Sequence, residues 1–414
     1  MKRISIAAAL ASVISLSAAA CGGTAPGGTG GGTGGSGAIK IGTLHPLSGA
    51  SAGDGAQLEN GAKLAVEAIN AAGGVKALKG AKLQLASGDT QGKPDVGQSE
   101  AQRLIQGGAV ALVGTYMSAV SANVAAVAER NQVPFVMDVT GDDGILKHGY
   151  KYSFRIQPPN SQMGTVGAQN LYDIAKSAGH PVKKVAYLHD QTAFGTSVLA
   201  GFKAQAAKLG FQVGPDISYD PASVSDLTTQ ITQVKASGAD VLAVTGYYRD
   251  SVLAAKAVAS VKPRLNAVFG VADGAFDQPQ FPADAGAAGK GYYDSNYRLD
   301  ANNPKASALA TLYQQRFHTQ MRSEAALAYD AVRVIAAGLE KSGSRDRGKL
   351  RDAVSGLTLD STVIGNGPIK FDQTGQNVNA LPVAVQVQGT TTKVVYPAKY
   401  AEDDATPAYP VTGG

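Results

Sequence analysis

The chain has 414 residues, of which 44% are hydrophobic and 17% are charged, so it can bury large apolar cores, and its length suggests two or three domains. Its 37 Lys and Arg residues against 32 Asp and Glu residues leave a formal net charge of only +5. So small an excess, without any block of like charge, excludes the basic surface by which proteins bind nucleic acid.

Residues 1–20 have the layout of a secretory signal peptide, with two basic residues, an apolar run and then small residues. The apolar run is shorter than the roughly 20 residues of a membrane-spanning helix. Cleavage after residue 20 would make Cys21, the one cysteine of the chain, the N-terminal residue. This segment resembles the lipobox of bacterial lipoproteins, which implies that Cys21 is lipidated and anchors the protein to the outside of the bacterial cell membrane. Ala18 departs from the Leu usual in that motif, so secretion after cleavage nearby is the alternative.

Residues 21–38 link this leader to the rest of the chain and, after the cysteine, consist almost entirely of Gly, Thr and Ser. Such a composition has little apolar surface to bury, so it predicts a flexible tether. A tether of this length has a root-mean-square reach of about 22 Å. We therefore expect a folded body held a short distance from the membrane.

From residue 39 onward, short β-rich runs alternate with amphipathic stretches, which is the pattern of an α/β fold with parallel sheets. Apolar residues recur at helical spacing over 58–69, 194–209 and 327–339, and Gly73 and Gly210 supply stops after the first two stretches. The runs expected to form strands are 39–44, 82–86, 109–113, 134–137, 185–188, 241–244 and 267–269.

The strand, loop and helix that begin at Ile41 are similar to those that begin at Val185, which favours two lobes of similar plan over one large sheet. Extended stretches flanked by turn residues occur at 151–156, 291–298 and 364–371, and we expect the chain to cross between the lobes there. The predicted fold is α/β, with two Rossmann-like lobes of parallel-rich sheets joined by a three-crossover hinge. The expected segments are 39–157 with 291–366 for the first lobe, 158–290 with 367–400 for the second lobe, and 401–414 for a C-terminal tail.

Short motifs spread over most of the chain occur in a specific order and spacing. They are Pro46–Gly49, Asn60–Ala62, Ala68–Asn70, Val113–Gly114 with Ser118, Tyr152–Arg155, His189–Asp190, Phe194–Gly195, Gly246–Tyr247 and Ala328–Ala331. Through these motifs, residues 39–400 resemble the type I periplasmic solute-binding proteins of branched-chain and hydrophobic amino acid ABC transporters, the leucine/isoleucine/valine-binding group. The resemblance implies two lobes that close over a small solute.

The first lobe contains candidate ligand residues at the end of a predicted strand. In doubly wound sheets a ligand lies beyond the carboxyl ends of the strands, so the residues just after each strand are candidates. Ser118 follows the run that ends at Val113, and its hydroxyl, with the N–H groups of a following helix, could hold a carboxylate. A helix N-cap is the alternative role for Ser118. Tyr116 is an adjacent candidate that could instead be a packing residue.

A second group of candidates directly follows the next expected strand. The resemblance implies that Val139, Thr140 and Gly141 bind the ligand, through a main-chain carbonyl that faces an ammonium group and a Thr hydroxyl that faces a carboxylate. The neighbouring Asp142 and Asp143 are expected to cap a helix rather than to contact the ligand.

The second lobe is expected to contribute aromatic faces and one acid. By the resemblance, Phe194 and Tyr247 cover the ligand, with Tyr248 as a lower-ranked neighbour, and Phe194 replaces a frequent tyrosine, which makes that wall more apolar. Asp273 follows an expected strand at a position where the family commonly has an acid for the ligand ammonium. A charge-assisted hydrogen bond there would contribute about 1.5–3 kcal/mol. The alternative is an Asp-Gly turn in which Asp273 caps its own backbone.

No enzyme motif is present, since the sequence has no G-x-S-x-G elbow, H-E-x-x-H helix or P-loop. The five histidines are scattered, and none pairs with Cys or another His at metal-ligand spacing. His45 and His189 follow strands and are expected to be ordinary polar residues at strand ends. We therefore expect no catalytic residue, no metal and no cofactor, although acids such as Asp142, Asp190 and Asp273 could meet in the folded chain.

These observations predict a monomeric, lipid-anchored solute receptor of an ABC importer. It would capture a branched-chain or hydrophobic amino acid, or a related solute, and deliver it to a membrane permease. A ligand-sensing receptor of the same fold is the first alternative, and an enzyme acting on a small amide or amino acid is the second. The first lobe would bind the solute first, and the second lobe would then close over it.

Overall fold

The computed structural model describes residues 37–403 and 405–411. The predicted signal peptide 1–20, the lipidation site Cys21 and the tether up to residue 36 lie outside the described residues, so they stay predictions. Within the described part of the chain, no helix combines the length and the hydropathy needed to cross a lipid bilayer.

The first lobe is organised by parallel strands that follow the expected β-rich runs. They are β1 (Ile39–His45), β2 (Leu83–Asp89), β3 (Ala111–Gly114), β4 (Phe135–Met137) and β5 (Ser153–Arg155). Their order in the sheet is β2-β1-β3-β4-β5, and every neighbouring pair is parallel. Because β5 occupies half of the expected crossover 151–156, the chain leaves this lobe only after Arg155.

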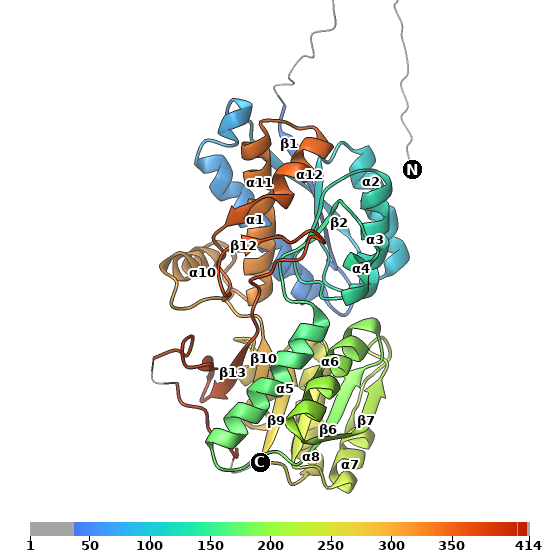
Figure 1. Ribbon diagram of the computed structural model, residues 1–414, viewed down its shortest axis with the longest axis vertical. Helices are drawn as coiled ribbons and strands as arrows, with labels where there is room; N and C mark the ends of the chain where they lie inside the picture. Colours follow the sequence, from blue (N-terminus) through green and yellow to red (C-terminus); the bar gives the residue numbers. More distant parts are fainter. Residues whose placement is uncertain (1–36, 404, 412–414) are drawn as a thin grey trace, which may run out of the picture. The chain divides into compact units, whose positions relative to one another are not determined.

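Helices cover both faces of this sheet (Figure 1). They are α1 (Ala52–Ala71), η1 (Lys76–Leu78), α2 (Pro94–Gln106), α3 (Ser118–Arg130), α4 (Asp143–Lys147), α10 (Pro304–Phe317), α11 (Ser323–Ser342) and α12 (Arg347–Ser355). Successive residues of a strand point to opposite faces. Val113 therefore packs with α1 and α11 in one core, whereas Leu112 packs with α2 and α3 in another.

The second lobe contains a larger, mixed sheet. Its strands are β6 (Lys184–Asp190), β7 (Gln212–Tyr219), β8 (Val241–Thr245), β9 (Ala267–Val271), β10 (Tyr293–Asn296), β13 (Val383–Gln388) and β14 (Thr391–Tyr396). They lie in the order β14-β13-β10-β9-β8-β6-β7, with β13 antiparallel to both of its neighbours and the other pairs parallel. Of these strands, β6, β8 and β9 were expected as strands from the sequence.

The helices of the second lobe also cover both faces of their sheet. They are α5 (Asn160–Ser177), α6 (Ala193–Leu209), α7 (Thr228–Ser237), α8 (Tyr248–Val261), α9 (Phe281–Ala285) and η2 (Gly286–Gly289). Helix α6 follows its sequence signals closely. The Thr192 hydroxyl accepts a hydrogen bond from the Phe194 N–H at 3.3 Å, and the helix ends at Gly210, whose φ of 83° is readily adopted by glycine.

Within the described residues, the chain passes between the lobes three times. It does so after β5, after β10, and between β12 (Ile369–Lys370) and β13; β12 itself pairs with β11 (Thr358–Leu359). The expected first-lobe segment 291–366 differs from the structure at its start, because β10 pairs with β9 and β13 of the second sheet. The polar run Asp294-Ser295-Asn296 hid this buried strand from a reading based on hydropathy.

The expected second-lobe segment 367–400 also differs at its start. The Arg155 N–H of β5 donates to the Gly375 carbonyl at 2.8 Å, and the rings of Phe154 and Phe371 lie 5.2 Å apart. Residues around 371–375 therefore pack against the first lobe before the chain enters β13. The last described residues pack on the second lobe, where the Val411 N–H donates to the Asn266 carbonyl at 2.7 Å.

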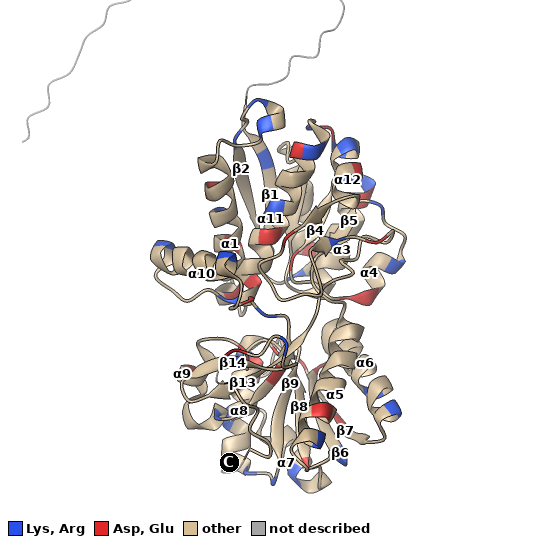
Figure 2. Cartoon of the chain, turned by 60° about the vertical axis from the view of Figure 1, so that its left-hand side comes forward, with Lys and Arg blue, Asp and Glu red and all other residues tan. Residues whose placement is uncertain are grey.

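Charged residues of both signs are interspersed over both lobes (Figure 2). Several acids and two arginines, Arg155 and Arg322, are exceptions, because they are buried. Asp54, Asp273, Asp277 and Glu324 are at most 5% exposed, and Arg322 is 9% exposed. A buried charge is costly unless it is paired and hydrogen-bonded, so these side chains require a structural or functional reason.

Candidate functional site

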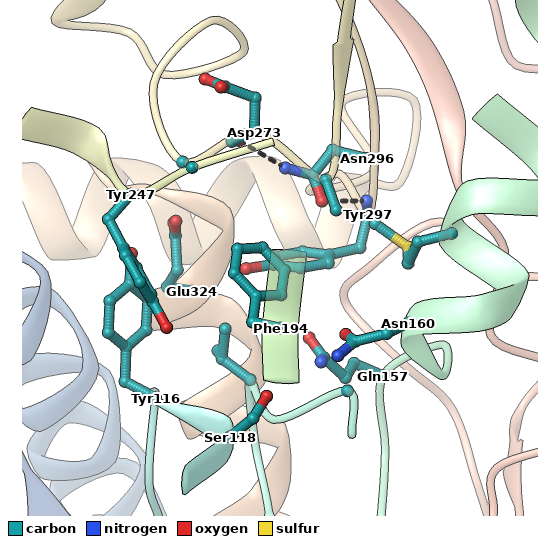
Figure 3. A pocket seen from close by; sticks show the side chains of 16 residues that line it. Tyr116, Ser118, Gln157, Asn160, Phe194, Tyr247, Asp273, Asn296, Tyr297 and Glu324 are labelled. Atoms are coloured by element: carbon teal, nitrogen blue, oxygen red, sulfur yellow. Dashed lines mark hydrogen bonds between the residues drawn. The ribbon is translucent and has the colours of Figure 1, made fainter. Parts of the chain in front are cut away.

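A cavity with ≈ 450 Å³ of unfilled space, part of it open to solvent, lies between the strand ends of the two lobes (Figure 3). Only ≈ 40 Å³ of this space admits the centre of a water-sized sphere, so the cavity is narrow with the lobes placed as they are in this structure. The first lobe lines it with Tyr116, Ser118, Val139, Gly141 and Glu324. The second lobe and the crossovers supply the other walls.

Seven of the eight predicted ligand residues line this cavity. They come together because each follows a strand of one of the sheets, and the carboxyl ends of parallel strands meet at one edge. The eighth residue, Thr140, is fully buried and does not line the cavity. The seven residues are Tyr116, Ser118, Val139, Gly141, Phe194, Tyr247 and Asp273.

Several helices of the described chain begin at the cavity. Ser118 and Tyr247 line it at the starts of α3 and α8, and the N-cap side chain of neither helix bonds the first N–H groups. Asn160 lines it at the start of α5, where the first two N–H groups donate to the Gly141 carbonyl and the Asp143 carboxylate. The first N–H groups of α3 and α8 lack intrahelical partners, and the helix dipole places partial positive charge on them. This edge of the cavity therefore suits an anionic group such as a carboxylate.

Ser118 is placed to add a hydroxyl to this edge. The N-cap of α3 is Met117, so the alternative role of Ser118 as the helix N-cap does not apply. Ser118 is instead the first residue of the helix, and it is 4% exposed where it lines the cavity.

Aromatic rings from both lobes form an apolar wall. Tyr116 of the first lobe lies 5.7 Å from Tyr247 of the second lobe, and Tyr247 lies 5.4 Å from Phe194, measured between ring centroids. Burial raises the pKa of Tyr116 and Tyr247 well above the ordinary value, so both hydroxyls stay protonated. The lower-ranked candidate Tyr248 does not line the cavity and packs against Arg322 instead.

The segment after β4 corrects one prediction. The Thr140 hydroxyl is hydrogen-bonded to the Ser121 hydroxyl, which in turn lies 2.7 Å from the Thr115 hydroxyl. These contacts tie the segment to α3, so the Thr140 hydroxyl does not face the cavity as the resemblance implied. Gly141 does lie at the cavity, and a Cβ there would come within 1.9 Å of the Asn160 side-chain oxygen, so the close approach of Asn160 requires glycine.

Asp142 and Asp143 act as helix caps, as expected. The Asp142 carboxylate accepts a hydrogen bond from the Gly144 N–H at 2.7 Å and caps α4. The Asp143 carboxylate accepts one from the Ser161 N–H at 2.9 Å, at the start of α5. Asp143 thus joins the first lobe to the first helix of the second lobe.

Asp273 lines the cavity, but its carboxylate does not serve it. One oxygen accepts hydrogen bonds from the Ala275 and Phe276 N–H groups at 2.9 and 3.1 Å, and the other accepts one from the Ser251 hydroxyl at 2.6 Å. The side chain is fully buried, and burial raises its pKa to about 8. The turn-capping alternative therefore describes Asp273, and the predicted contact with a ligand ammonium is not supported.

The sequence reasoning missed further residues that line the cavity. Gln157 and Asn160 follow β5, and Glu324 is the second residue of α11. Asn296 ends the unrecognised β10, and Tyr297 follows it. Asn296 and Tyr297 lie within the expected crossover 291–298, so they could have been proposed as cavity walls. Glu324 had no such signal, because an acid in the first turn of a helix is common.

Arg322 connects an ion pair of the first lobe to the second lobe. Arg322, just before α11, places its Nη1 2.7 Å from the Asp54 carboxylate of the first lobe. Its Nε donates to the Gln280 side chain of the second lobe at 3.0 Å, and its guanidinium lies 4.4 Å from the centre of the Tyr248 ring. Arg322 therefore stabilises the arrangement in which the two lobes meet.

The two strand-end histidines have structural partners. His45 is fully buried, with Nε2 2.9 Å from Asp138 and Nδ1 3.2 Å from Glu59. Burial alone would lower the pKa of His45, but the two carboxylates raise it to about 9. His189 pairs with Asp216 at 2.8 Å. Neither histidine lines the cavity, and in the part of the chain that the structure covers, no three His, Cys, Asp or Glu side chains are grouped as a metal site.

Comparison with known sequences gives consistent relatives. The family model described as "Periplasmic binding protein" matches residues 38–391. The Leu/Ile/Val-binding protein homolog 8 of Brucella abortus is 29% identical over 374 residues, which cover 88% of this chain and 91% of that protein. The Leu/Ile/Val-binding protein homolog 7 of Brucella suis is 30% identical over 371 residues, covering 87% of this chain and 91% of that protein.

Solved structures share the fold at lower sequence identity. A leucine-binding protein of Thermotoga maritima superposes with a TM-score of 0.75 at 22% identity, covering 86% of this chain and 97% of that one. A solute-binding protein of R. palustris in complex with benzoate superposes with a TM-score of 0.74 at 22% identity, covering 90% of this chain and 99% of that one. A branched-chain amino acid binding protein of Streptococcus pneumoniae in complex with isoleucine superposes with a TM-score of 0.73 at 23% identity, covering 87% of this chain and 100% of that one.

Proposed function

This chain belongs to the type I periplasmic binding proteins, in the group of the branched-chain amino acid ABC transporters, and we propose that it captures a small carboxylic acid with an apolar body and delivers it to a transport permease. Hydrophobic amino acids and aromatic acids both belong to this ligand class. The relatives support this range, since one solved structure is a complex with isoleucine and another is a complex with benzoate.

The observation that carries the proposal is the cavity between the lobes. One edge collects the uncapped starts of α3 and α8 together with Ser118, and these groups suit a carboxylate. Another wall of the cavity is apolar, because the rings of Phe194, Tyr116 and Tyr247 form it, and this wall suits the apolar body of a ligand. A carboxylate joined to a small apolar group matches both walls.

Binding and closure are coupled in this proposal. Because the cavity has walls on both lobes, a ligand held there contacts both lobes only when they are closed. It therefore shifts the population toward the closed state, which a permease can recognise. The family works outside the cytoplasm, and lipidation of Cys21 would keep the receptor near its permease.

Calorimetry on protein stripped of ligand by unfolding and refolding tests the proposal. We expect at least one acid from a panel of leucine, isoleucine, valine, benzoate and hydroxybenzoates to bind with micromolar or tighter affinity. Ser118→Ala should weaken that binding about tenfold, because it removes one hydrogen bond to a charged group. Failure of every amino acid and aromatic acid to bind would refute the proposal. Mass spectrometry of intact protein from membranes tests the lipid on Cys21 separately.

A further inference from the structure

Glu324 has a carboxylate oxygen that the protein leaves unused. The residue is 2% exposed and lines the cavity from the start of α11 (Figure 3). Its Oε1 accepts a hydrogen bond from the Gln278 side chain of the second lobe at 3.0 Å. Its Oε2 is buried and has no hydrogen-bond partner among the residues that the structure describes. Buried polar atoms are rarely left without a partner, so this oxygen needs an explanation.

Neighbouring groups do not supply that partner. The nearest cation on the same helix start, Arg322, directs its donors to Asp54 and Gln280. The Gln278 amide group that bonds Oε1 also donates to Asp277 at 2.7 Å, so its two protons are committed to acids. Tyr297, another wall of the cavity, lies within electrostatic reach, since burial and then the Glu324 charge raise its pKa.

A purely structural role does not explain this placement. An acid in the first turn of a helix interacts favourably with the helix dipole, and it does so from a solvent-exposed position. Asp95 in the first turn of α2 is such an acid, and it is exposed. Glu324 has the same position in its helix but is buried at the cavity, where the loss of water makes an unpaired oxygen costly.

We propose that Glu324 is a specificity-determining residue whose free oxygen forms a hydrogen bond with a hydroxyl or amino group of the ligand, so that the receptor prefers small carboxylic acids that carry such a group over the parent acids that lack it. This inference rests on the proposed function, because it concerns the same cavity. It adds a polar requirement to a site otherwise defined by a carboxylate edge and an aromatic wall.

The charges around the cavity also orient the ligand. The charges of Asp277, Arg322 and Asp54 all bear on Glu324, and Arg322 is already paired with Asp54, so its charge is not free for a ligand carboxylate here. The uncapped helix starts and Ser118 attract the carboxylate to their own edge instead. The donor of the ligand is then set apart from its carboxylate and meets Glu324.

The Gln278 contact connects this selectivity to closure. Glu324 belongs to the first lobe and Gln278 to the second, so their hydrogen bond forms only when the lobes meet. A ligand donor on Oε2 and the Gln278 amide on Oε1 then complete the same carboxylate. Sites built to hydrogen-bond a ligand group reject analogues that lack it, because the site's buried groups stay unpaired.

Matched ligand pairs test the proposal by calorimetry on stripped protein. The pairs are benzoate with 3- and 4-hydroxybenzoate, and valerate with 5-hydroxyvalerate and 5-aminovalerate. In the unmodified protein, a donor-bearing acid should bind at least about tenfold more tightly than its parent. In Glu324→Met, which keeps a similar volume without an acceptor, the preference should fall to about twofold or less.

Ser118→Ala is the matched control, because Ser118 faces the carboxylate that both members of a pair share. It should weaken the binding of both members equally and leave the ratio of their affinities unchanged.

Glu324→Gln is the second variant should Glu324→Met fail to fold. It should keep most of a preference for a hydroxyl, because the amide carbonyl still accepts a hydrogen bond, and it should lose a preference for 5-aminovalerate. Binding of parent and donor-bearing acids with equal affinity in the unmodified protein, or a ratio that neither Glu324 variant changes, would overturn the proposal. Silence of all these acids would also overturn this inference, and the proposed function falls with it only if leucine, isoleucine and valine fail to bind as well.

Discussion

Two acids at the same cavity use their carboxylates in opposite ways. Asp273, in the loop after β9, commits both oxygens to protein donors, whereas Glu324, at the start of α11, leaves one oxygen without a partner among the described residues. Both are buried, and burial raises the pKa of each to about 8. Burial beside a cavity therefore does not distinguish a ligand contact from a scaffold residue. The distinction lies in the hydrogen-bonding capacity that the fold leaves free.

The largest effect should come from Asp273→Ala, through stability. The variant leaves two N–H groups and a hydroxyl without their acceptor, which should lower the free energy of unfolding by about 4 kcal/mol. Urea unfolding measures it, and Asp95→Ala, at an exposed acid, is the control with a change of about 0.5 kcal/mol or less. A tenfold loss of ligand affinity with unchanged stability would instead restore the ammonium role of Asp273.

The pH dependence of the free energy of unfolding should reveal the raised pKa of Glu324. Unfolded Glu324 loses its proton near pH 4.5, whereas the folded side chain keeps it until about pH 8, because burial and then the Asp277 charge raise the pKa. The folded state binds more protons in that window, so the stability contributed at low pH is lost as the pH rises. Relative to Glu324→Gln, the ligand-free protein should lose on the order of 3 kcal/mol between pH 4.5 and 8. Parallel stability curves for the two proteins in urea titrations would show that Glu324 ionises normally.

A variant of Arg322, whose side chain bonds Asp54 and Gln280, tests whether this residue affects closure of the lobes and not ligand selectivity. Arg322→Met leaves Asp54 unpaired and removes the bond to Gln280, so it should cost about 2 kcal/mol of stability and weaken every ligand several-fold. The ratio of affinities for a donor-bearing acid and its parent should stay the same. Chemical denaturation and calorimetry measure the two effects, and a changed ratio would assign selectivity to Arg322 as well.

Gly141→Ala should have the smallest effect, and a local one. Its Cβ would lie 1.9 Å from the Asn160 side-chain oxygen, so Asn160 must move from the cavity wall, and ligand affinity should fall about tenfold. Gly53→Ala is the matched control, because no atom lies within 4 Å of a Cβ at that position of α1. Equal ligand affinities of the two variants would show that Asn160 does not contribute to ligand binding.

The strands of the first lobe were predictable because they are apolar and short. Each expected run in residues 39–137 overlaps an observed strand, and the family predicted from the motifs is confirmed. In the second lobe, β7, β10, β13 and β14 were not expected as strands. Of these, β10 reads Tyr-Asp-Ser-Asn, and its polar side chains are satisfied by contacts such as that between Asn296 and the Asp273 carbonyl. A hydropathy pattern does not contain such partners.

The candidate site was predictable where position along a strand decides it. Ser118, Gly141 and Tyr247 reach the cavity because residues after parallel strands collect at one edge. The direction of a side chain was not predictable. Thr140 and Asp273 sit at the right positions, but their polar atoms are hydrogen-bonded within the protein.

The sequence by itself determined the α/β architecture, the family and the strand ends that surround the ligand, because these follow from local periodicity and from motifs read in order. Only the tertiary structure decided which acid is free to meet a ligand. The Asp273 carboxylate accepts hydrogen bonds from backbone N–H groups two and three residues away. Glu324 keeps an oxygen without a partner among the described residues, because α11, which comes late in the chain, packs beside strands that come early in it. That choice depends on which hydrogen-bond donors the fold brings within about 3 Å, and such distances exist only in three dimensions.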